Sequence, residues 1–354
     1  MTLLSIQYLR AVAALMVVVT HLHPQWVRMG YDGAWPFWLI SGVDIFFVIS
    51  GFIMWQTTQG KSISPATFYY RRAIRIIPLY WLLTSVVVIV LLVAPGLLQS
   101  TRFEGWHVVS SYLFIPSINP GNGNLEPLLI PGWTLNYEMF FYVLFGASLI
   151  LPQRMRLGAV TTLLVALTLL GPTQITTGSP LAFYTSSILL EFIFGMWLSR
   201  IYIAGRLPAM APAAWVLIIG GFTLLPAMTL VGTDLPRALT MGLPALMIVA
   251  GALALEQQGR LPDSPALLVL GNASYSLYLS HPLVLSASSQ LWRAAGLHAQ
   301  QGIFGGAGNW LFSLVALSFS VIVALFTFRY LERPISSGLR QLTQARTGKM
   351  PVYR

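Results

Sequence analysis

The sequence predicts an all-α membrane protein, a polytopic bundle of about ten transmembrane helices. Hydrophobic residues make up 56% of the 354 residues and charged residues only 8%, against about 25% charged residues in soluble globular proteins. Apolar stretches recur along the whole chain, each close to the roughly 20 residues that the core of a bilayer requires. Because no hydrophilic stretch is long enough to fold by itself, we expect one membrane domain over residues 1–336 and a basic cytoplasmic tail over residues 337–354.

The limits of the spans follow from apolar length and turn residues. The first stretch is interpreted as a retained helix rather than a signal peptide, because it lacks a basic start and a small-residue cleavage site. The second contains Gly42 and Gly51, which allow helices to approach closely. From the third onward, proline and glycine turns bound each span, and the fifth and seventh are the least regular. The expected spans are residues 3–22, 37–56, 75–95, 132–151, 157–172, 183–202, 212–230, 237–255, 266–289 and 308–330.

The net charge of +10 is explained by membrane topology rather than by nucleic-acid binding. An even number of spans places both termini on one side, and the basic residues other than Arg10 divide fifteen to four in favour of that side. This asymmetry is typical of proteins whose termini are cytoplasmic. The fifteen are Lys61, Arg71, Arg72, Arg75, Arg154, Arg156, Arg200, Arg206, Arg260, Arg329, Arg333, Arg340, Arg346, Lys349 and Arg354, and the four are Arg28, Arg102, Arg237 and Arg293.

Two connections between spans are long enough to suggest a function. Residues 57–74 are basic, and residues 96–131, on the opposite side, are rich in aromatic side chains. The apolar stretch 107–116 is too short to span the membrane and is expected to dip into the outer leaflet. The chain has no cysteine, which excludes disulfides, thiolate metal sites and cysteine nucleophiles. Its five histidines show no metal-ligand spacing, so no metal is expected.

Arg10 and His21 are the most informative pair in the chain. They lie eleven residues apart in one apolar span, so in a helix they share one face at a separation of about 16 Å along the axis. A buried cation costs a few kcal/mol at least and is usually retained for a purpose, and an imidazole exchanges protons near neutral pH. The pair therefore indicates catalysis or proton handling more than a structural span.

Four further ionisable residues fall inside the predicted spans: Asp44, Glu138, Glu191 and His281. Such groups normally face a bundle interior or a watery cavity. We expect Asp44, Glu138 and His281 to surround one cavity together with His21, since all four lie in the outer halves of their spans. The alternative is that some pair with each other to fix helix packing. For His281, which precedes a proline, capping or bonding to the backbone is a further alternative.

Two clusters have both a functional and a structural interpretation. Trp133 and Tyr137 either belong to an interfacial aromatic belt or stack against a sugar ring. Arg71, Arg72 and Arg75 share the start of the third span at helical spacing. Their guanidinium groups either hold the phosphates of a donor such as coenzyme A or anchor the chain at anionic lipid. Spacing alone does not separate these readings.

Six segments, in order along residues 1 to about 336, resemble the acyltransferase-3 family of integral-membrane acyltransferases. A single segment would be weak evidence, but six in register cover nearly the whole chain. Within the family, the sequence is most similar to stand-alone bacterial exopolysaccharide O-acetyltransferases. The segments are Arg10-x10-His21, GVDIFFVISGF, RRAIRIIPLYW, the WTLNYE of Trp133 to Glu138, SYSLYLSHP and YLERP.

The resemblance implies an enzyme of the bacterial inner membrane with no bound cofactor. It implies an acyl-coenzyme A donor, most often acetyl-coenzyme A, in the cytoplasm. The acceptor is then a hydroxyl of a surface polysaccharide or its lipid-linked precursor on the far side. By the same resemblance, His21 is the essential histidine, Arg10 its partner, and Arg72 and Arg75, with Arg71 beside them, the donor-binding element. Glu138 and His281 match recurrent family positions whose roles are open.

The expected mechanism has His21 as general base on the acceptor hydroxyl. Asp44 or Glu138 would fix the tautomer of its imidazole, and Arg10 would stabilise the oxyanion or the leaving thiolate. The other polar and aromatic candidates, Trp133, Tyr137, Glu191 and His281, would line the acceptor pocket. A covalent acetyl-His21 intermediate is the alternative route.

Two other functions compete with this one. A transporter or flippase of a glycan or lipid precursor would also need about ten spans and intramembrane charges, but the chain shows no repeated halves. The second competing function is a transferase whose acceptor is a lipid hydroxyl. The sequence leaves open the acceptor sugar, an acyl group larger than acetyl, and the oligomeric state.

Overall fold

The computed structural model describes residues 3–97, 101–171, 179–232, 234–298 and 307–347. Their regular secondary structure is helical, apart from one isolated antiparallel bridge between Ile118 and Leu125, which confirms the predicted all-α class. The helices are α1 (Leu4–Arg28), α2 (Gly42–Thr58), α3 (Pro65–Val93), α4 (Gly105–Tyr112), α5 (Gly132–Ser148), α6 (Gln153–Leu170), α7 (Pro180–Tyr184), α8 (Leu189–Ile203), α9 (Ala211–Val231), α10 (Leu243–Gln257), α11 (Pro265–Asn272), α12 (Ser274–Ala294), α13 (Gly308–Thr327) and α14 (Arg333–Thr347). Short helical turns precede α2, follow α3, precede α10 and join α13 to α14, at η1 (Phe37–Ser41), η2 (Pro95–Leu97), η4 (Ala238–Gly242) and η6 (Phe328–Glu332).

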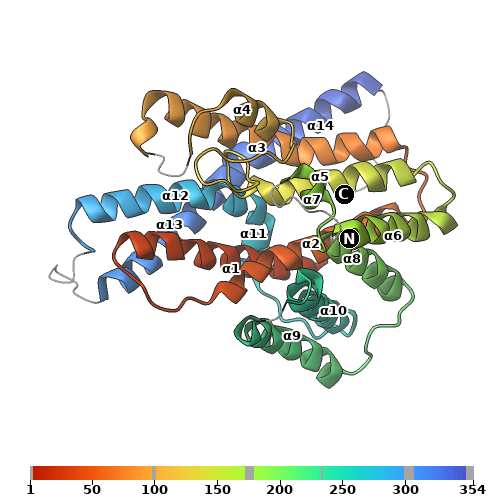
Figure 1. Cartoon of the computed structure of the whole chain (residues 1–354). Helices are drawn as coiled ribbons and strands as arrows, with labels where there is room; N and C mark the ends of the chain where they lie inside the picture. Colours follow the sequence, from red (N-terminus) through yellow and green to blue (C-terminus); the bar gives the residue numbers. More distant parts are fainter. Residues whose placement is uncertain (1–2, 98–100, 172–178, 233, 299–306, 348–354) are drawn as a thin grey trace.

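Eight of the described helical segments are long and apolar enough to cross a membrane, so the protein is a multi-pass membrane protein. They include α1, α3, α6 and α9, and the segments that combine η1 with α2, α7 with α8, η4 with α10, and α13 with α14. The predicted span 132–151 corresponds to α5, which is only 17 residues long. The predicted span 266–289 is not one helix, because the structure divides it at Ala273 into α11 and the serine-rich α12. Both α5 and α12 lie within the same bundle (Figure 1).

Several helices extend past their predicted limits, among them α1, which continues to Arg28. α3 starts ten residues before the expected span, because Ser64 caps it by accepting a hydrogen bond from the Thr67 amide and Pro65 occupies its first turn. The arginines at 71, 72 and 75 therefore lie inside a helix rather than before one. At the other end of the chain, residues 337–347 of the predicted tail continue α14, and residues 348–354 lie outside the described residues.

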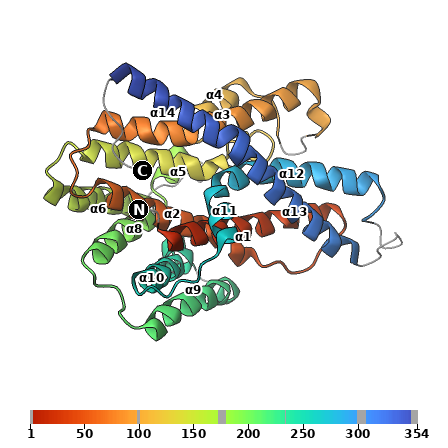
Figure 2. The same cartoon turned by 180° about the vertical axis from the view of Figure 1, so that it is seen from behind.

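α1 and α2 run through the middle of the bundle. α3 and α14 lie on one side of them and α9 and α10 on the opposite side, as two views related by a half-turn show (Figures 1 and 2). The start of α1 is tied to the end of α10, because the Glu256 carboxylate accepts hydrogen bonds from the amides of Leu4 and Ser5, at 2.8 and 3.1 Å. A carboxylate at this position also complements the positive end of the helix dipole.

Glycines let the central helices touch backbone to backbone. A Cβ at Gly195 of α8 would lie 2.0 Å from the carbonyl oxygen of Val48 on α2, and a Cβ at Gly51 of α2 would lie 2.1 Å from that of Phe192 on α8. Small residues that permit such approach are typical of membrane helix pairs. The close α2–α8 contact confirms the role expected for Gly51.

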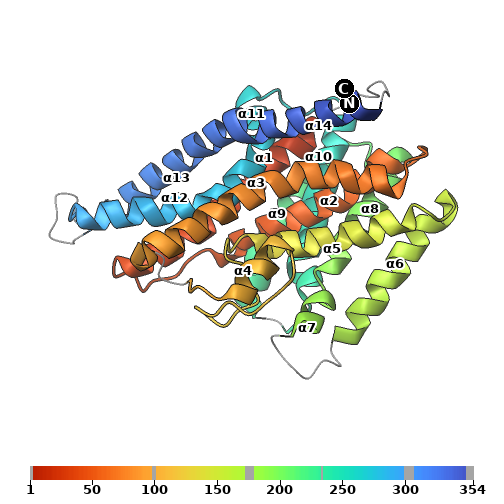
Figure 3. The same cartoon turned by 90° about the horizontal axis from the view of Figure 1, so that it is seen from above.

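The loop between α3 and α5 folds against the bundle (Figure 3). Its helix α4 covers most of the stretch predicted to enter the bilayer, and insertion there stays a prediction. The Tyr80 hydroxyl on α3 donates to the Ser111 carbonyl at 3.0 Å. His107 is fully buried within the loop, and its Nδ1 lies 3.0 Å from the hydroxyl of Ser117. Burial lowers the pKa of His107 below its usual value of 6.5, so its ring is neutral at pH 7.

Candidate active site

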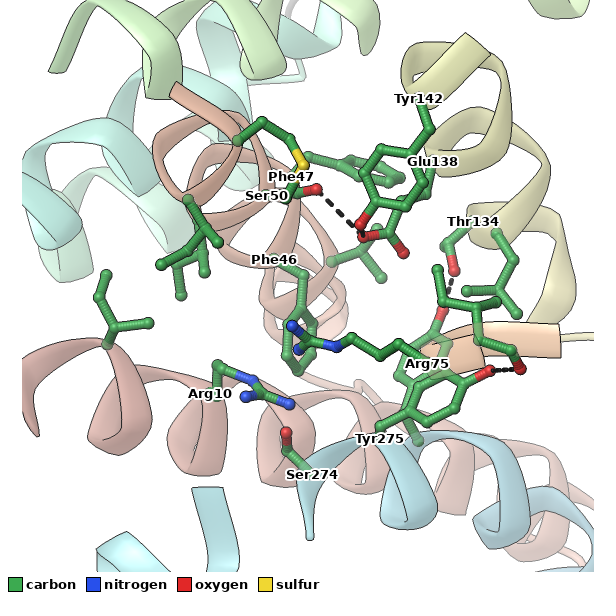
Figure 4. A pocket seen from close by; sticks show the side chains of 18 of the residues that line it. Arg10, Phe46, Phe47, Ser50, Arg75, Thr134, Glu138, Tyr142, Ser274 and Tyr275 are labelled. Carbon is green, nitrogen blue, oxygen red and sulfur yellow. Dashed lines mark hydrogen bonds between the residues drawn. The ribbon is translucent and has the colours of Figure 1, made fainter. Parts of the chain in front are cut away.

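A cavity of about 150 Å³ lies between α1, α2, α3, α5 and α12 (Figure 4). This is far more than the roughly 10–15 Å³ that one water molecule needs. Most of its wall is apolar, and its polar groups include Arg10 of α1, Arg75 of α3 and Glu138 of α5. The side chains of Arg10 and Arg75 extend into the same space from opposite walls (Figure 4). A cavity with two cations and one carboxylate in its lining is suited to an anionic ligand.

Glu138 is held in place by two hydroxyl groups. Its Oε1 accepts hydrogen bonds from Ser50 of α2 at 3.0 Å and from Tyr142, one turn further along α5, at 2.5 Å (Figure 4). Glu332 of η6 accepts a 2.6 Å hydrogen bond from Ser276 of α12 and interacts electrostatically with the cavity arginines. The arginines therefore face carboxylates that are already hydrogen-bonded within the protein.

His21 lies against His281 rather than in the cavity. The centroids of the two rings are 4.9 Å apart with an angle of 65° between their planes. Nδ1 of His21 lies 2.8 Å from the Val17 carbonyl oxygen. A carbonyl only accepts, so this Nδ1 carries the proton and Nε2 keeps a free lone pair. His21 is not fully buried as a residue.

His281 is fully buried on α12. Its Nδ1 lies 3.2 Å from the carbonyl oxygen of Leu277 one turn earlier, as the backbone-bonding alternative required. The alternative that it caps a helix end is wrong, because α12 continues through Pro282 to Ala294. Both imidazoles therefore point their Nδ1 at their own helix.

The prediction of one cavity around His21, Asp44, Glu138 and His281 is wrong. Of the other three residues, His281 is the one that contacts His21. Glu138 instead lines the cavity that contains Arg10 and Arg75. Asp44 is separated from both, because it forms a bidentate ion pair with Arg237: Nε to Oδ1 is 2.9 Å and Nη2 to Oδ2 is 2.7 Å. A carboxylate with both oxygens bound to a guanidinium does not orient His21, so the role expected for Asp44 is also wrong.

The sequence places Arg237 on the external side, at the first residue of the predicted span 237–255. In the structure it directly precedes η4, and its side chain is only 28% exposed. Glu191 of α8 is fully buried beside this pair, next to Gly242. One signal could have revealed the pairing: an aspartate inside a span needs a partner, and few basic residues lie at that end of the bundle. The alternative in which these charges fix helix packing is the one that fits Asp44.

We expect the substitution Asp44→Ala to destabilise the fold rather than to remove a catalytic group. Arg237 would be left largely buried without its partner, and breaking a buried ion pair typically costs about 3–5 kcal/mol. The loss of stability is measured by unfolding the protein in detergent with heat or with denaturant. The matched double variant Asp44→Ala with Arg237→Leu should cost less than the sum of the two single variants. Strict additivity would show that the pair contributes no coupling.

The aromatic candidates on α5 do not form an open sugar platform. The ring of Tyr137 is stacked on Phe183 of α7 with centroids 3.7 Å apart and is only 5% exposed. Stacking of a sugar on Tyr137 is therefore wrong. Trp133 is partly buried and its ring centroid lies 6.0 Å from that of Tyr137, and its contact with an acceptor stays a prediction.

The three arginines of α3 occupy different surroundings. Arg75 lines the cavity. Arg72 is partly buried, with its guanidinium 5.6 Å from the ring centroid of Phe68 and 5.8 Å from that of Tyr142. Arg71 is exposed at the surface. They therefore do not form one compact cluster, because Arg72 is partly buried among aromatic rings whereas Arg71 and Arg75 are exposed.

Several cavity residues escaped the sequence analysis because they are neutral and common in membrane helices. Ser50, Thr134, Tyr275 and Tyr278 line the cavity, yet nothing in their local sequence distinguishes them from packing residues. Among the described residues, no group of three or more histidines and carboxylates could hold a metal ion.

Comparison with known proteins shows which family this chain matches. The model of the acyltransferase-3 family, described as "Acyltransferase domain", matches residues 3–329. The exopolysaccharide production protein ExoZ of Rhizobium meliloti is 36% identical over 299 residues, which are 83% of this chain and 89% of that protein. The O-acetyltransferase OatA of Staphylococcus aureus is 24% identical over 92% of this chain, which matches 56% of its own length. The peptidoglycan O-acetyltransferase OatA of Listeria monocytogenes is 32% identical over 41% of this chain and 24% of its own length. No solved structure matches this chain significantly.

Proposed function

This chain belongs to the acyltransferase-3 family, and on that premise we propose that it transfers an acetyl group from acetyl-coenzyme A to a hydroxyl of a surface polysaccharide. The family makes it an acyltransferase. The polysaccharide acceptor is supported by the name of ExoZ, an exopolysaccharide production protein, and the acetyl group by the names of the O-acetyltransferases. We place the protein in a bacterial inner membrane with its termini in the cytoplasm, where the excess of basic loop residues belongs.

One observation carries the proposal: the cavity that Arg10 and Arg75 line is also lined by Tyr278, which lies one helical turn before His281, and His281 contacts His21. Coenzyme A is a long polyanion, so its phosphates would bind Arg71, Arg72 and Arg75 at the cytoplasmic end of α3. Its thin pantetheine arm would then extend along the cavity toward the histidines. The acceptor would approach His21 from the other side of the membrane.

In the proposed reaction, Nε2 of His21 takes the proton of the acceptor hydroxyl. The hydroxyl oxygen forms a bond to the thioester carbonyl carbon, and the carbon–sulfur bond of the donor breaks. The proton finally passes to the departing thiolate, so an ester and free coenzyme A are formed. Arg10 would stabilise the negative charge that develops on the carbonyl oxygen or on the sulfur. In the covalent alternative, His21 itself first receives the acetyl group.

The experiment that tests the proposal compares the polymer from cells with the intact chain and cells with a deletion. In the cells with the deletion, we expect proton NMR to show that the polymer has lost its acetyl esters while the yield of polymer is unchanged. In vesicles, purified protein should release coenzyme A from acetyl-coenzyme A in the presence of the polymer. The chain has no cysteine, so a thiol reagent reports released coenzyme A alone. If export of the polymer instead collapses with its ester content unchanged, the protein is a transporter or flippase and the proposal is wrong.

A further inference from the structure

The part of the cavity nearest the histidines is lined by Phe46, Tyr278 and Thr134, which we define as the aromatic wall. All three residues line the cavity, whereas His21 and His281 do not. The ring centroids of Phe46 and Tyr278 are 5.8 Å apart at an angle of 69°. Tyr278 lies on α12 and Phe46 on α2, so the two rings of the wall come from different helices.

Hydrogen bonds hold the tyrosine of this wall in place. Its hydroxyl oxygen lies 2.9 Å from Oγ1 of Thr134 on α5 and 3.3 Å from the Pro131 carbonyl oxygen. Tyr278 is only 7% exposed. A buried ring that is fixed at its hydroxyl cannot swing aside without breaking these contacts. The Tyr278 ring is therefore a fixed part of the cavity lining in this structure.

The wall also lies next to the proposed reaction centre. Tyr278 precedes His281 by one helical turn, and the centroids of their rings are 6.1 Å apart. A donor whose phosphates lie at the start of α3 would bring the acyl end of its pantetheine arm to this wall. Any carbon beyond the acetyl methyl would then have to fit against Phe46 and Tyr278.

We propose that Phe46 and Tyr278 limit the length of the acyl group, so that the enzyme accepts acetyl and rejects butyryl donors. This inference rests on the proposed acyl-coenzyme A donor and names the residues that select its acyl group. Tightly packed protein interiors accommodate extra methylene groups only by shifting side chains. One methylene in a shaped apolar pocket typically changes specificity by about 10–200-fold.

A competition experiment with purified protein in vesicles tests the wall. Equal concentrations of acetyl- and butyryl-coenzyme A are supplied with the polymer, and mass spectrometry measures the ratio of the two esters. We expect at least about tenfold preference for acetyl with the unchanged chain. Phe46→Ala and Tyr278→Ala should each raise the butyryl share about tenfold. The matched variant Tyr278→Phe keeps the ring and removes only the hydroxyl, so it should leave the ratio nearer that of the unchanged chain.

The outcomes separate this inference from the proposed function. If the unchanged chain forms neither ester, the proposed donor is wrong. If it forms both esters equally well, the wall does not select the acyl group, whatever the variants do. Acetyl preference that persists at full strength in Phe46→Ala and Tyr278→Ala would also overturn the inference. Should the alanine variants fail to fold, Phe46→Leu shortens the same wall and is subject to the same expectation.

Discussion

We expect His21→Ala to reduce transfer of the acyl group by about 10²–10⁴-fold, the usual contribution of a general base. Nδ1 of His21 is bound to the carbonyl of its own helix, and the residue is not fully buried, so we expect its removal to leave the fold intact. The acetyl esters of the polymer, measured by proton NMR, and the release of coenzyme A in vesicles should both fall together. Polymer yield should not change.

His23→Ala is the matched control for this experiment. His23 lies two residues further along α1, and its ring contacts Phe37 and Trp35 at centroid distances of 4.7 and 5.6 Å. It lies outside the lining of the cavity and the histidine pair, so its loss should leave transfer near the level of the unchanged chain. Wild-type ester content in the His21→Ala variant would show that His21 is not the base.

A further experiment with the unchanged protein distinguishes direct attack of the hydroxyl on the thioester from transfer through an acetylated His21. If the acetyl group passes through His21, rapid quenching with labelled acetyl-coenzyme A and no acceptor should trap an adduct on that residue. If the hydroxyl attacks the thioester directly, no label should appear on the protein before acceptor is added. The His21→Ala variant provides the background for this measurement.

We expect Gly195→Ala to prevent the protein from folding stably. The added Cβ would lie 2.0 Å from the Val48 carbonyl oxygen and 2.6 Å from the Phe52 amide nitrogen, and both are backbone atoms of the buried α2. Overpacking a core usually costs about 1–3 kcal/mol when side chains can yield, and here the backbone must move instead. The measurement is the yield of monodisperse protein in detergent and its thermal unfolding.

Gly158→Ala is the matched control, because a Cβ at that position on α6 meets no atom within 4 Å. Alanine also has a higher helix propensity than glycine by about 1 kcal/mol, so this variant should be at least as stable as the unchanged chain. Equal yield and stability for the two alanine variants would mean that α2 and α8 are not in backbone contact.

The candidate site was only partly predictable. The eleven-residue spacing placed Arg10 and His21 on one face of α1, and the structure has them in one unbroken helix, Arg10 in the cavity and His21 beyond it. The partner of His21 was misassigned, because a carboxylate was expected where His281 lies. The ion pair of Asp44 joins residues 193 positions apart. Nothing local to either residue encodes that contact.

The sequence by itself determined the class of the protein, the positions of most of its membrane helices and the family to which it belongs. These properties depend on the length and apolarity of segments and on motifs, which are local to the chain. The tertiary structure alone decided which charged and aromatic groups meet: Glu138 with Ser50, Asp44 with Arg237, and Tyr278 with Phe46. The physical reason is that such contacts depend on how each helix is rotated and which helix lies beside it. In a bundle, these properties follow from packing among all the helices together.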